Sequence, residues 1–395
     1  MTRPDSHPLS PPWAALASLA LALLMGCPGP GNTIKSRGVT LQCGRLSQPD
    51  ADRRACLPLT IASVDEQDVA FESLRGDGSP IPLRGTLSRP TFPPGVDPPD
   101  ALPAVLLIGD DGPLSRDGVI DRDAAGPFRE PVPFLRQLAE ALSRRGYVVL
   151  RADKRTCAAC TSNPLVQSAS WDELVGDATA AARFLVAQPG VEPQDLIIIG
   201  HGQGVALALD MEIDASALVA LGANALPIDQ VMIQRARRQL EALESDAVGD
   251  AVRKKTAVGK KNAVNKRDIE NARRRLAEVE STMLALDEGA FPEDFLVLDL
   301  HMPSFWKGWL EASRRIPQAL RAFNGDVLVA QGEDDLEAGE EDLRAFADAL
   351  KDRPGAAVAP ALPGLSHALH RRDGPGQISD EALVTIIGWL GRQRP

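Results

Sequence analysis

The chain has 395 residues, of which 44% are hydrophobic and 25% are charged, a composition typical of a folded globular protein. This excludes a wholly disordered or fibrous chain, and the length suits one large domain or two modest ones. The formal net charge of −11 argues against nucleic-acid binding, which needs a segregated basic surface. Five cysteines are too few for a fold held together mainly by disulfides.

Residues 1–26 read as a secretion signal. An apolar run at 14–24 follows Arg3; it is too short to span a bilayer but has the length of a signal-peptide core. It ends in a Leu-Met-Gly-Cys sequence at Cys27, which resembles the lipobox of bacterial lipoproteins. The resemblance implies that Cys27 is lipidated, becomes the N-terminus and anchors the protein in the bacterial cell envelope, periplasm-facing or at the outer membrane. The alternative is a buried apolar helix with a chance cysteine.

If Cys27 carries lipid, four cysteines remain in an oxidising compartment. Proximity in sequence pairs Cys43 with Cys56 and Cys157 with Cys160 as candidate disulfides. The second pair forms a Cys-x-x-Cys motif, which is also found in thioredoxin-like redox sites. Because it follows a strand in a loop, and not a helix N-terminus that would stabilise a thiolate, we favour a loop disulfide or two free thiols.

After a lipidated cysteine and flexible tether at 27–60, residues 61–395 are expected to form the folded domain. Strand-like runs at 69–74 and 83–87 flank a turn at 75–78. Short apolar runs, which fit strands buried on both faces of a parallel sheet, follow at 104–108, 147–150, 196–199, 218–221 and 327–330. Helical patterns lie between them at 134–145, 172–188 and 341–350. This alternation predicts an α/β fold with a mostly parallel central sheet flanked by helices.

Residues 228–290 break the alternation, with charged helix formers and no strand pattern. An insertion here, between two late strands, is placed to be a helical lid over a site. Its Lys and Arg residues at 253–255, 260–261, 266–267 and 273–275 fit either a solvated helix face or a basic surface for anionic lipid head groups. Aromatic residues that stack on bases are absent from this stretch, so we expect no nucleic-acid partner.

A glycine-rich pentad, Gly200-His201-Gly202-Gln203-Gly204, links the apolar run 196–199 to a helical pattern. Strand, tight turn and helix in this order resemble the nucleophile elbow of the α/β-hydrolase fold, Gly-x-Ser-x-Gly. The resemblance is to bacterial serine esterases of the dienelactone-hydrolase-like and serine-peptidase-like groups, and it includes motifs at 112–113, 116–118, 153–155, 332–335 and 362–367. It implies an α/β-hydrolase fold. A phosphate or dinucleotide turn is the alternative, but the spacing is not the Rossmann fingerprint.

The chain departs from this family at the nucleophile, because Gly202 stands where the family has its serine. Glycine offers no oxygen for acyl transfer. The resemblance assigns Asp335 as the triad acid, with Asp334 as the near alternative, and His367 as the triad histidine. It also assigns the oxyanion-hole amides to Gln203 and Asp111.

Asp110 and Asp111 are a second departure, because relatives commonly carry a neutral glycine–serine stretch in this loop. Carboxylates here disfavour a nearby anion, unless both point to solvent and cap the following turn. We expect His370 at the surface, and structural ion pairs from the Arg116-Asp117 and Lys154-Arg155 sequences. The five histidines lack metal-ligand spacing, so we expect no metal and no cofactor.

Three hypotheses follow. The first is a degenerate esterase that binds an ester-, acyl- or peptide-like ligand or a partner protein. The second is a working hydrolase in which His367, backed by Asp335, activates a water above Gly202. The third is a structural envelope lipoprotein whose basic lid is the working surface. Under the first hypothesis, Gly202→Ser alone is expected to create ester hydrolysis that depends on His367.

Overall fold

The computed structural model describes residues 33–36, 39–42, 46–50, 55–119, 132–157, 160, 169–254, 266–298, 301–371, 374 and 376–393. Cys27 and Cys43 therefore lie outside the described residues. The chain divides into two compact units, Met1–Leu59 with Arg394–Pro395, and Thr60–Gln393. The first unit contains two antiparallel hairpins within the range expected as a tether: β1 (Thr33–Ser36) with β2 (Val39–Gln42), and β3 (Ser47–Asp50) with β4 (Ala55–Pro58).

The second unit is built on an eight-stranded sheet with the strand order β12-β11-β10-β9-β7-β8-β6-β5. Strands β5 and β6 pair antiparallel, as do β6 and β8, and every pairing from β8 to β12 is parallel. The strands are β5 (Ser63–Leu74), β6 (Pro80–Thr91), β7 (Leu102–Ile108), β8 (Val148–Ala152), β9 (Val191–His201), β10 (Ala217–Leu221), β11 (Asp326–Ala330) and β12 (Ala356–Val358).

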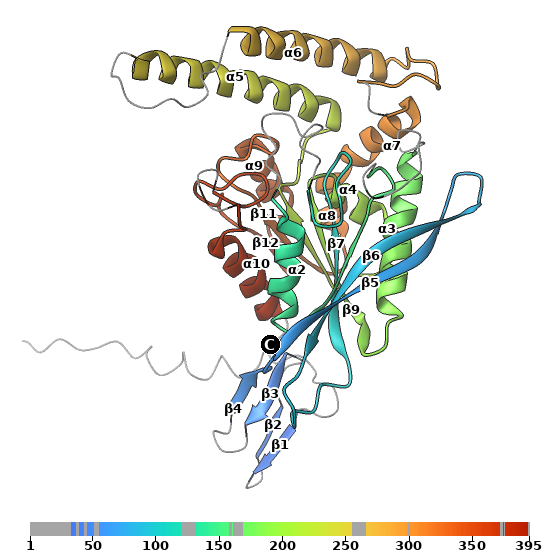
Figure 1. Ribbon diagram of the computed structural model, residues 1–395, viewed down its shortest axis with the longest axis vertical. Coiled ribbons are helices and arrows are strands. Elements are labelled where there is room, and N and C mark those ends of the chain that lie inside the picture. The colour runs from blue at the N-terminus through green and yellow to red at the C-terminus, as the bar shows by residue number, and fades with distance from the viewer. Residues whose placement is uncertain are drawn as a thin grey trace, which may run out of the picture. The chain divides into compact units, whose positions relative to one another are not determined.

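Helices cover both faces of this sheet (Figure 1). Helix α2 packs on β8 and against α10, whereas α3 and α4 pack on the other side, on β5, β7 and β9. The helices are α2 (Phe134–Ser143), α3 (Trp171–Val186), α4 (Gln203–Asp210), α5 (Ile228–Lys254), α6 (Lys266–Asp287), α7 (Pro303–Ser313), α8 (Ile316–Ala322), α9 (Glu340–Ala349) and α10 (Asp380–Gln393).

The core follows from the apolar runs seen in the sequence. Every residue of β7 and of β10 is buried, as expected for central strands covered by helices on both faces. Helix α3 begins with a capping box, in which the Ser170 hydroxyl accepts from the Glu173 amide and the Glu173 carboxylate accepts from the Ser170 amide. The cap fixes where the helix starts, and its buried face then packs on the sheet.

Helices α5 and α6 follow β10 and precede β11 in the chain, and they form an antiparallel pair (Figure 1). Two of their basic side chains are paired with acids across the two helices: Arg237 bonds Glu280 at 3.2 Å, and Arg273 bonds Glu244 at 2.6 Å. In the described part, these helices therefore present a mixed-charge surface. Exposed pairs of this kind contribute little to stability, but they lower the net positive charge that a lipid surface would meet.

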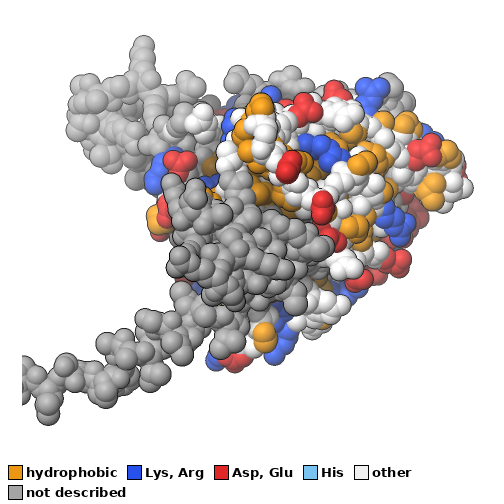
Figure 2. Space-filling model, turned by 90° about the horizontal axis from the view of Figure 1, so that it is seen from below, with side chains coloured by type: hydrophobic (Ala, Val, Ile, Leu, Met, Phe, Trp, Pro, Cys, Tyr) orange, Lys and Arg blue, Asp and Glu red, His pale blue; other side chains and the backbone are white. Residues whose placement is uncertain are grey.

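The coloured side chains of Figure 2 show a face on which acidic, basic and hydrophobic groups are interspersed. Within the described residues, no helix combines the length and the apolar character needed to cross a bilayer.

Candidate active site

The turn between β9 and α4 has the geometry of a nucleophile elbow. Gly202 separates the last strand residue, His201, from the first helical residue, Gln203, with φ 51° and ψ −116°. This positive φ favours glycine. A Cβ at Gly204 would lie 2.4 Å from the Ile108 carbonyl oxygen, so helix α4 starts in close contact with the end of β7. The pentad therefore folds as the tight strand-to-helix turn expected from its sequence.

Asp335 and His367 form the acid–histidine pair of this site. Asp335 follows β11, and its Oδ2 lies 2.8 Å from His367 Nδ1. Its Oδ1 accepts from the amides of Glu337 (2.7 Å) and Ala338 (3.0 Å), which fix the carboxylate in place. Asp335, and not its neighbour Asp334, thus faces the imidazole.

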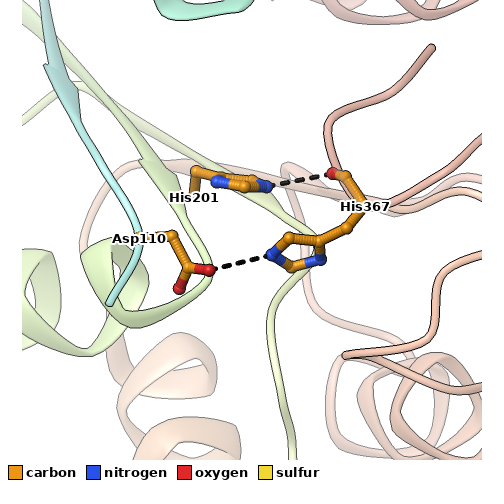
Figure 3. A group of neighbouring side chains, drawn as sticks. All are labelled: Asp110, His201 and His367. Atoms are coloured by element: carbon orange, nitrogen blue, oxygen red, sulfur yellow. Dashed lines mark hydrogen bonds and ion pairs between the residues drawn. The ribbon is translucent and has the colours of Figure 1, made fainter. Parts of the chain in front are cut away.

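Asp110 points toward His367 (Figure 3). It also occupies the space that a nucleophile side chain at position 202 would need. A Cβ built on Gly202 would lie 1.8 Å from Asp110 Oδ1, far inside van der Waals contact. Asp110 Oδ1 accepts from the Gln203 amide at 2.7 Å, and Oδ2 lies 3.0 Å from His367 Nε2. The oxyanion-hole amide expected at Gln203 is therefore already bound by a carboxylate of the chain itself.

Both ring nitrogens of His367 face carboxylate oxygens, which accept but do not donate when ionised. Burial alone would lower the pKa of His367, but the charges of Asp335 and Glu337 and the hydrogen bonds of Asp110 and Asp335 outweigh it, and the pKa lies well above 6.5. These contacts therefore favour the imidazolium form of the ring. In that state it has no lone pair with which to accept a proton.

His201 packs beside this pair as a neutral ring. Its Nε2 donates to the His367 carbonyl oxygen at 3.0 Å, and its ring lies 4.2 Å from the His367 ring and 4.5 Å from Phe134, centroid to centroid. Burial, reinforced by the positive charge of His367, lowers the pKa of His201 to about 4. His201 thus supports the loop that carries His367.

Helix α5, which the sequence analysis expected to belong to a lid, reaches the site through Arg235. The guanidinium pairs with Asp111 at 2.9 Å and with Glu337 at 3.1 Å, and Glu337 Oε2 lies 3.9 Å from His367 Nε2. The alternative that Asp110 and Asp111 both point to solvent is wrong, because Asp110 is 2% exposed and Asp111 is held by the lid. His370, expected at the surface, is also buried.

Lys154 is a positioning residue that the sequence did not identify as part of the site. Its Nζ donates to the Asp110 carbonyl oxygen at 2.6 Å and to Gln203 Oε1 at 2.8 Å. It therefore ties the loop after β7 to the start of α4. Sequence spacing does not show that a lysine after β8 contacts both the loop after β7 and the start of α4, because these segments meet only in the folded chain.

The other polar motifs form ion pairs. Arg116 bonds Asp153 at 2.6 Å and Asp68 at 2.9 Å, and Cys157 is joined to Cys160 by a disulfide. For Cys56, with its candidate partner Cys43 outside the described residues, the pairing stays a prediction.

Two groups in the described residues have ligand atoms at distances that suit a metal ion, although the sequence showed no metal-ligand spacing. One atom each from Asp110, His201 and His367 lie within 4.8 Å of one another, as do atoms of Asp110, Asp111 and Glu337. The three residues of the first group, and Glu337 in the second, come from segments distant in sequence, which is why spacing alone did not reveal either group.

The cavity beside Gly202 is small. Its volume is about 10 Å³, and it is lined by Gly202, Gln203, Asn224, Ser313 and apolar residues of α4, α5, α7, α8 and the loop before α5. A volume of this size holds about one water molecule. This one cavity is therefore too small for an acyl chain.

Residues 124–381 match the alpha/beta hydrolase family, a range that covers more than half of the chain. The chain belongs to this family. The fold predicted from the sequence is thereby confirmed, and the sheet order and the elbow agree with it. Among curated proteins, no relative with significant sequence similarity was found.

Solved structures similar to this chain include esterases. An esterase from Pyrococcus furiosus is 13% identical, with 84% of this chain and 92% of that chain covered and a TM-score of 0.47. Est1E from Butyrivibrio proteoclasticus is 15% identical (82% and 98% covered, TM-score 0.44), and the alpha/beta hydrolase GrgF from Penicillium sp. sh18 is 18% identical (84% and 99% covered, TM-score 0.48).

Proposed function

We propose that this protein is a degenerate ester hydrolase, a member of the alpha/beta hydrolase family that does not form an acyl-enzyme. The observation that carries the proposal is the Asp110 carboxylate, which lies within 1.8 Å of the position of a side-chain carbon at Gly202 and accepts the Gln203 amide. The two positions that depart from the esterase pattern, Gly202 and Asp110, therefore lie in direct contact. One removes the nucleophile, and the other fills both its space and the oxyanion hole.

The alternative of a water-activating hydrolase has less support. A general base needs a free lone pair within hydrogen-bond reach of the water. His367 Nε2, the nitrogen that would accept the proton, lies 3.0 Å from Asp110 Oδ2, and the raised pKa keeps the ring protonated. The cavity of about 10 Å³ beside Gly202 has no room for both a water and an ester.

We expect the unmodified protein to be inert toward serine-directed reagents and short esters. A fluorophosphonate probe should leave it unlabelled because no activated hydroxyl stands at position 202. The measurement is intact-mass analysis after probe treatment, together with hydrolysis of p-nitrophenyl acetate by the wild-type protein and by His367→Ala at equal concentration. Equal background rates support the proposal. A wild-type rate that drops in His367→Ala contradicts it and favours the water-activating alternative.

For the site of action, we propose that lipid at Cys27 anchors the protein in a bacterial envelope membrane. The support is the lipobox-like sequence that ends at Cys27. We expect the full chain, expressed in a Gram-negative host, to fractionate with membranes and Cys27→Ala to be released. Mass spectrometry of the mature N-terminus provides the decisive reading: a chain that starts at a residue other than Cys27, without lipid, contradicts the anchor.

A further inference from the structure

The loss of the serine leaves the hydrogen-bond donors of an ester-cleaving site in place. In such a site, a backbone N–H after the elbow residue stabilises the oxyanion. Here the Gln203 N–H donates to Asp110 Oδ1 at 2.7 Å, and His367 Nε2 lies 3.0 Å from Asp110 Oδ2. Each oxygen of one carboxylate thus receives one donor, and the Asp110 side chain is 3% exposed.

The charges at the site match a carboxylate. Asp335 and Glu337 face the His367 ring at 2.8 Å and 3.9 Å, and they favour its protonated form. An imidazolium donating to a carboxylate makes a charge-assisted hydrogen bond, which is stronger than a neutral one. Arg235 pairs with Asp111 and Glu337, so the other nearby acids have a cation of their own.

The carboxylate is delivered by a preorganised loop. Lys154 Nζ holds the Asp110 carbonyl oxygen at 2.6 Å, which fixes the peptide from which the side chain projects. Gly202 supplies the space, since any Cβ there would overlap the carboxylate. Three loops, after β7, between β9 and α4, and after β12, therefore meet around one carboxylate group (Figure 3).

We propose that the former catalytic centre is a carboxylate-binding site that the chain fills with its own Asp110, so that a small monocarboxylate binds there only when this side chain is absent. The proposal rests on the proposed loss of catalysis, and it changes the ligand class from an ester to its acid product. Asp110→Gly removes a CH₂–COO⁻ group. Acetate, CH₃–COO⁻, supplies the same atoms without the covalent link and takes the vacated place.

The test is rescue of Asp110→Gly by acetate at constant ionic strength. Thermal unfolding measures the stabilisation, and isothermal titration calorimetry measures the binding. We expect Asp110→Gly to melt below the wild-type protein, and sodium acetate to raise its Tm saturably while sodium chloride and acetamide do not. Wild-type protein should not respond, because Asp110 already occupies the site. His367→Gln in the Asp110→Gly background should weaken acetate binding at least tenfold.

Asp111→Gly is the matched control, since it removes a neighbouring carboxylate that pairs with Arg235 at 2.9 Å. Its Tm should respond equally to acetate and chloride. A folded Asp110→Gly protein that ignores acetate overturns the proposal. If this variant does not fold, Asp110→Ala replaces it with sodium formate as the probe, because alanine removes only the carboxylate: a folded Asp110→Ala protein whose Tm formate does not raise overturns the proposal.

A Zn²⁺ titration tests whether Asp110, His201 and His367 bind a metal ion instead. Stoichiometric Zn²⁺ binding by the wild-type protein that is lost in both His201→Ala and Asp110→Gly would make the cluster a metal site and overturn the carboxylate account. Neither result bears on ester turnover. Hydrolysis by the wild-type protein contradicts the proposed function, whereas failure of acetate rescue contradicts only the ligand class.

Discussion

The double variant Asp110→Gly/Gly202→Ser is expected to gain ester hydrolysis, and Gly202→Ser alone is expected to stay inactive. This corrects the expectation drawn from the sequence that restoring the serine suffices. A side-chain carbon at position 202 would lie 1.8 Å from Asp110 Oδ1, so a serine there has to displace a carboxylate that the Gln203 amide and His367 hold in place. Removing Asp110 also frees the Gln203 amide to bind the oxyanion.

The size of the gain follows from what the nucleophile contributes. Loss of the serine costs on the order of 10⁶ in kcat in a serine hydrolase, and imperfect placement by about 1 Å costs roughly 10². We therefore expect the double variant to exceed Gly202→Ser by at least about 10³-fold on p-nitrophenyl acetate. A fluorophosphonate probe should also label the double variant, at the hydroxyl introduced by Gly202→Ser.

Two further variants make this result specific. His367→Ala added to the double variant should abolish the gained activity, because the imidazole is the base that takes the hydroxyl proton. Asp111→Gly/Gly202→Ser keeps the obstructing carboxylate while removing its neighbour, so it should remain inactive. Activity in Gly202→Ser alone, or activity of Asp111→Gly/Gly202→Ser, contradicts the view that Asp110 blocks the site.

The fold was predictable because each of its signals is local. Continuous apolar runs marked the buried strands, and the glycine pentad marked the turn from β9 into α4. Chain order also brought Asp335 and His367 to the same edge of the sheet, since both follow carboxyl ends of parallel strands. The structure has them 2.8 Å apart.

The role of Asp110 was not predictable in the same way. The sequence marked the two acids after β7 as unusual, but whether a loop side chain turns to solvent or into the site depends on its backbone direction. That direction is set by Lys154, 44 positions away, and by the space left at Gly202. The relation between positions 110 and 202 is a steric contact between distant segments, and such contacts leave no periodicity or spacing in one sequence.

Replacing Arg155 by alanine is expected to cause the largest loss of stability among the ion-pair variants, about 3–5 kcal/mol in the free energy of unfolding. The guanidinium is 6% exposed, and its Nε donates to Asp177 at 2.6 Å and its Nη1 to Glu173 at 2.6 Å. It also donates to the Leu74 carbonyl oxygen at 2.8 Å. One side chain thus joins the loop after β8 to α3 and to the end of β5.

Urea unfolding followed by circular dichroism measures this loss, with Arg344→Ala as the matched control. Arg344 pairs with Glu340 on the surface of α9, where both side chains are at least 67% exposed. Such a pair contributes about 0.2–1 kcal/mol, so the control should unfold close to wild type. Equal losses in the two variants would mean that burial of the Arg155 network has no energetic consequence.

A double variant tests whether the Arg155–Asp177 ion pair adds net stability, or whether Arg155 only offsets the cost of the buried Asp177 charge. Burial already raises the pKa of Asp177 even with Arg155 beside it, so the carboxylate is costly to keep charged. Alanine at position 155 leaves that charge without its partner. Arg155→Met combined with Asp177→Leu removes both charges and keeps apolar volume, and replacing a buried pair in this way is often neutral. We therefore expect this double variant to unfold nearer to wild type than Arg155→Ala does, because most of the loss in the single variant comes from the stranded carboxylate.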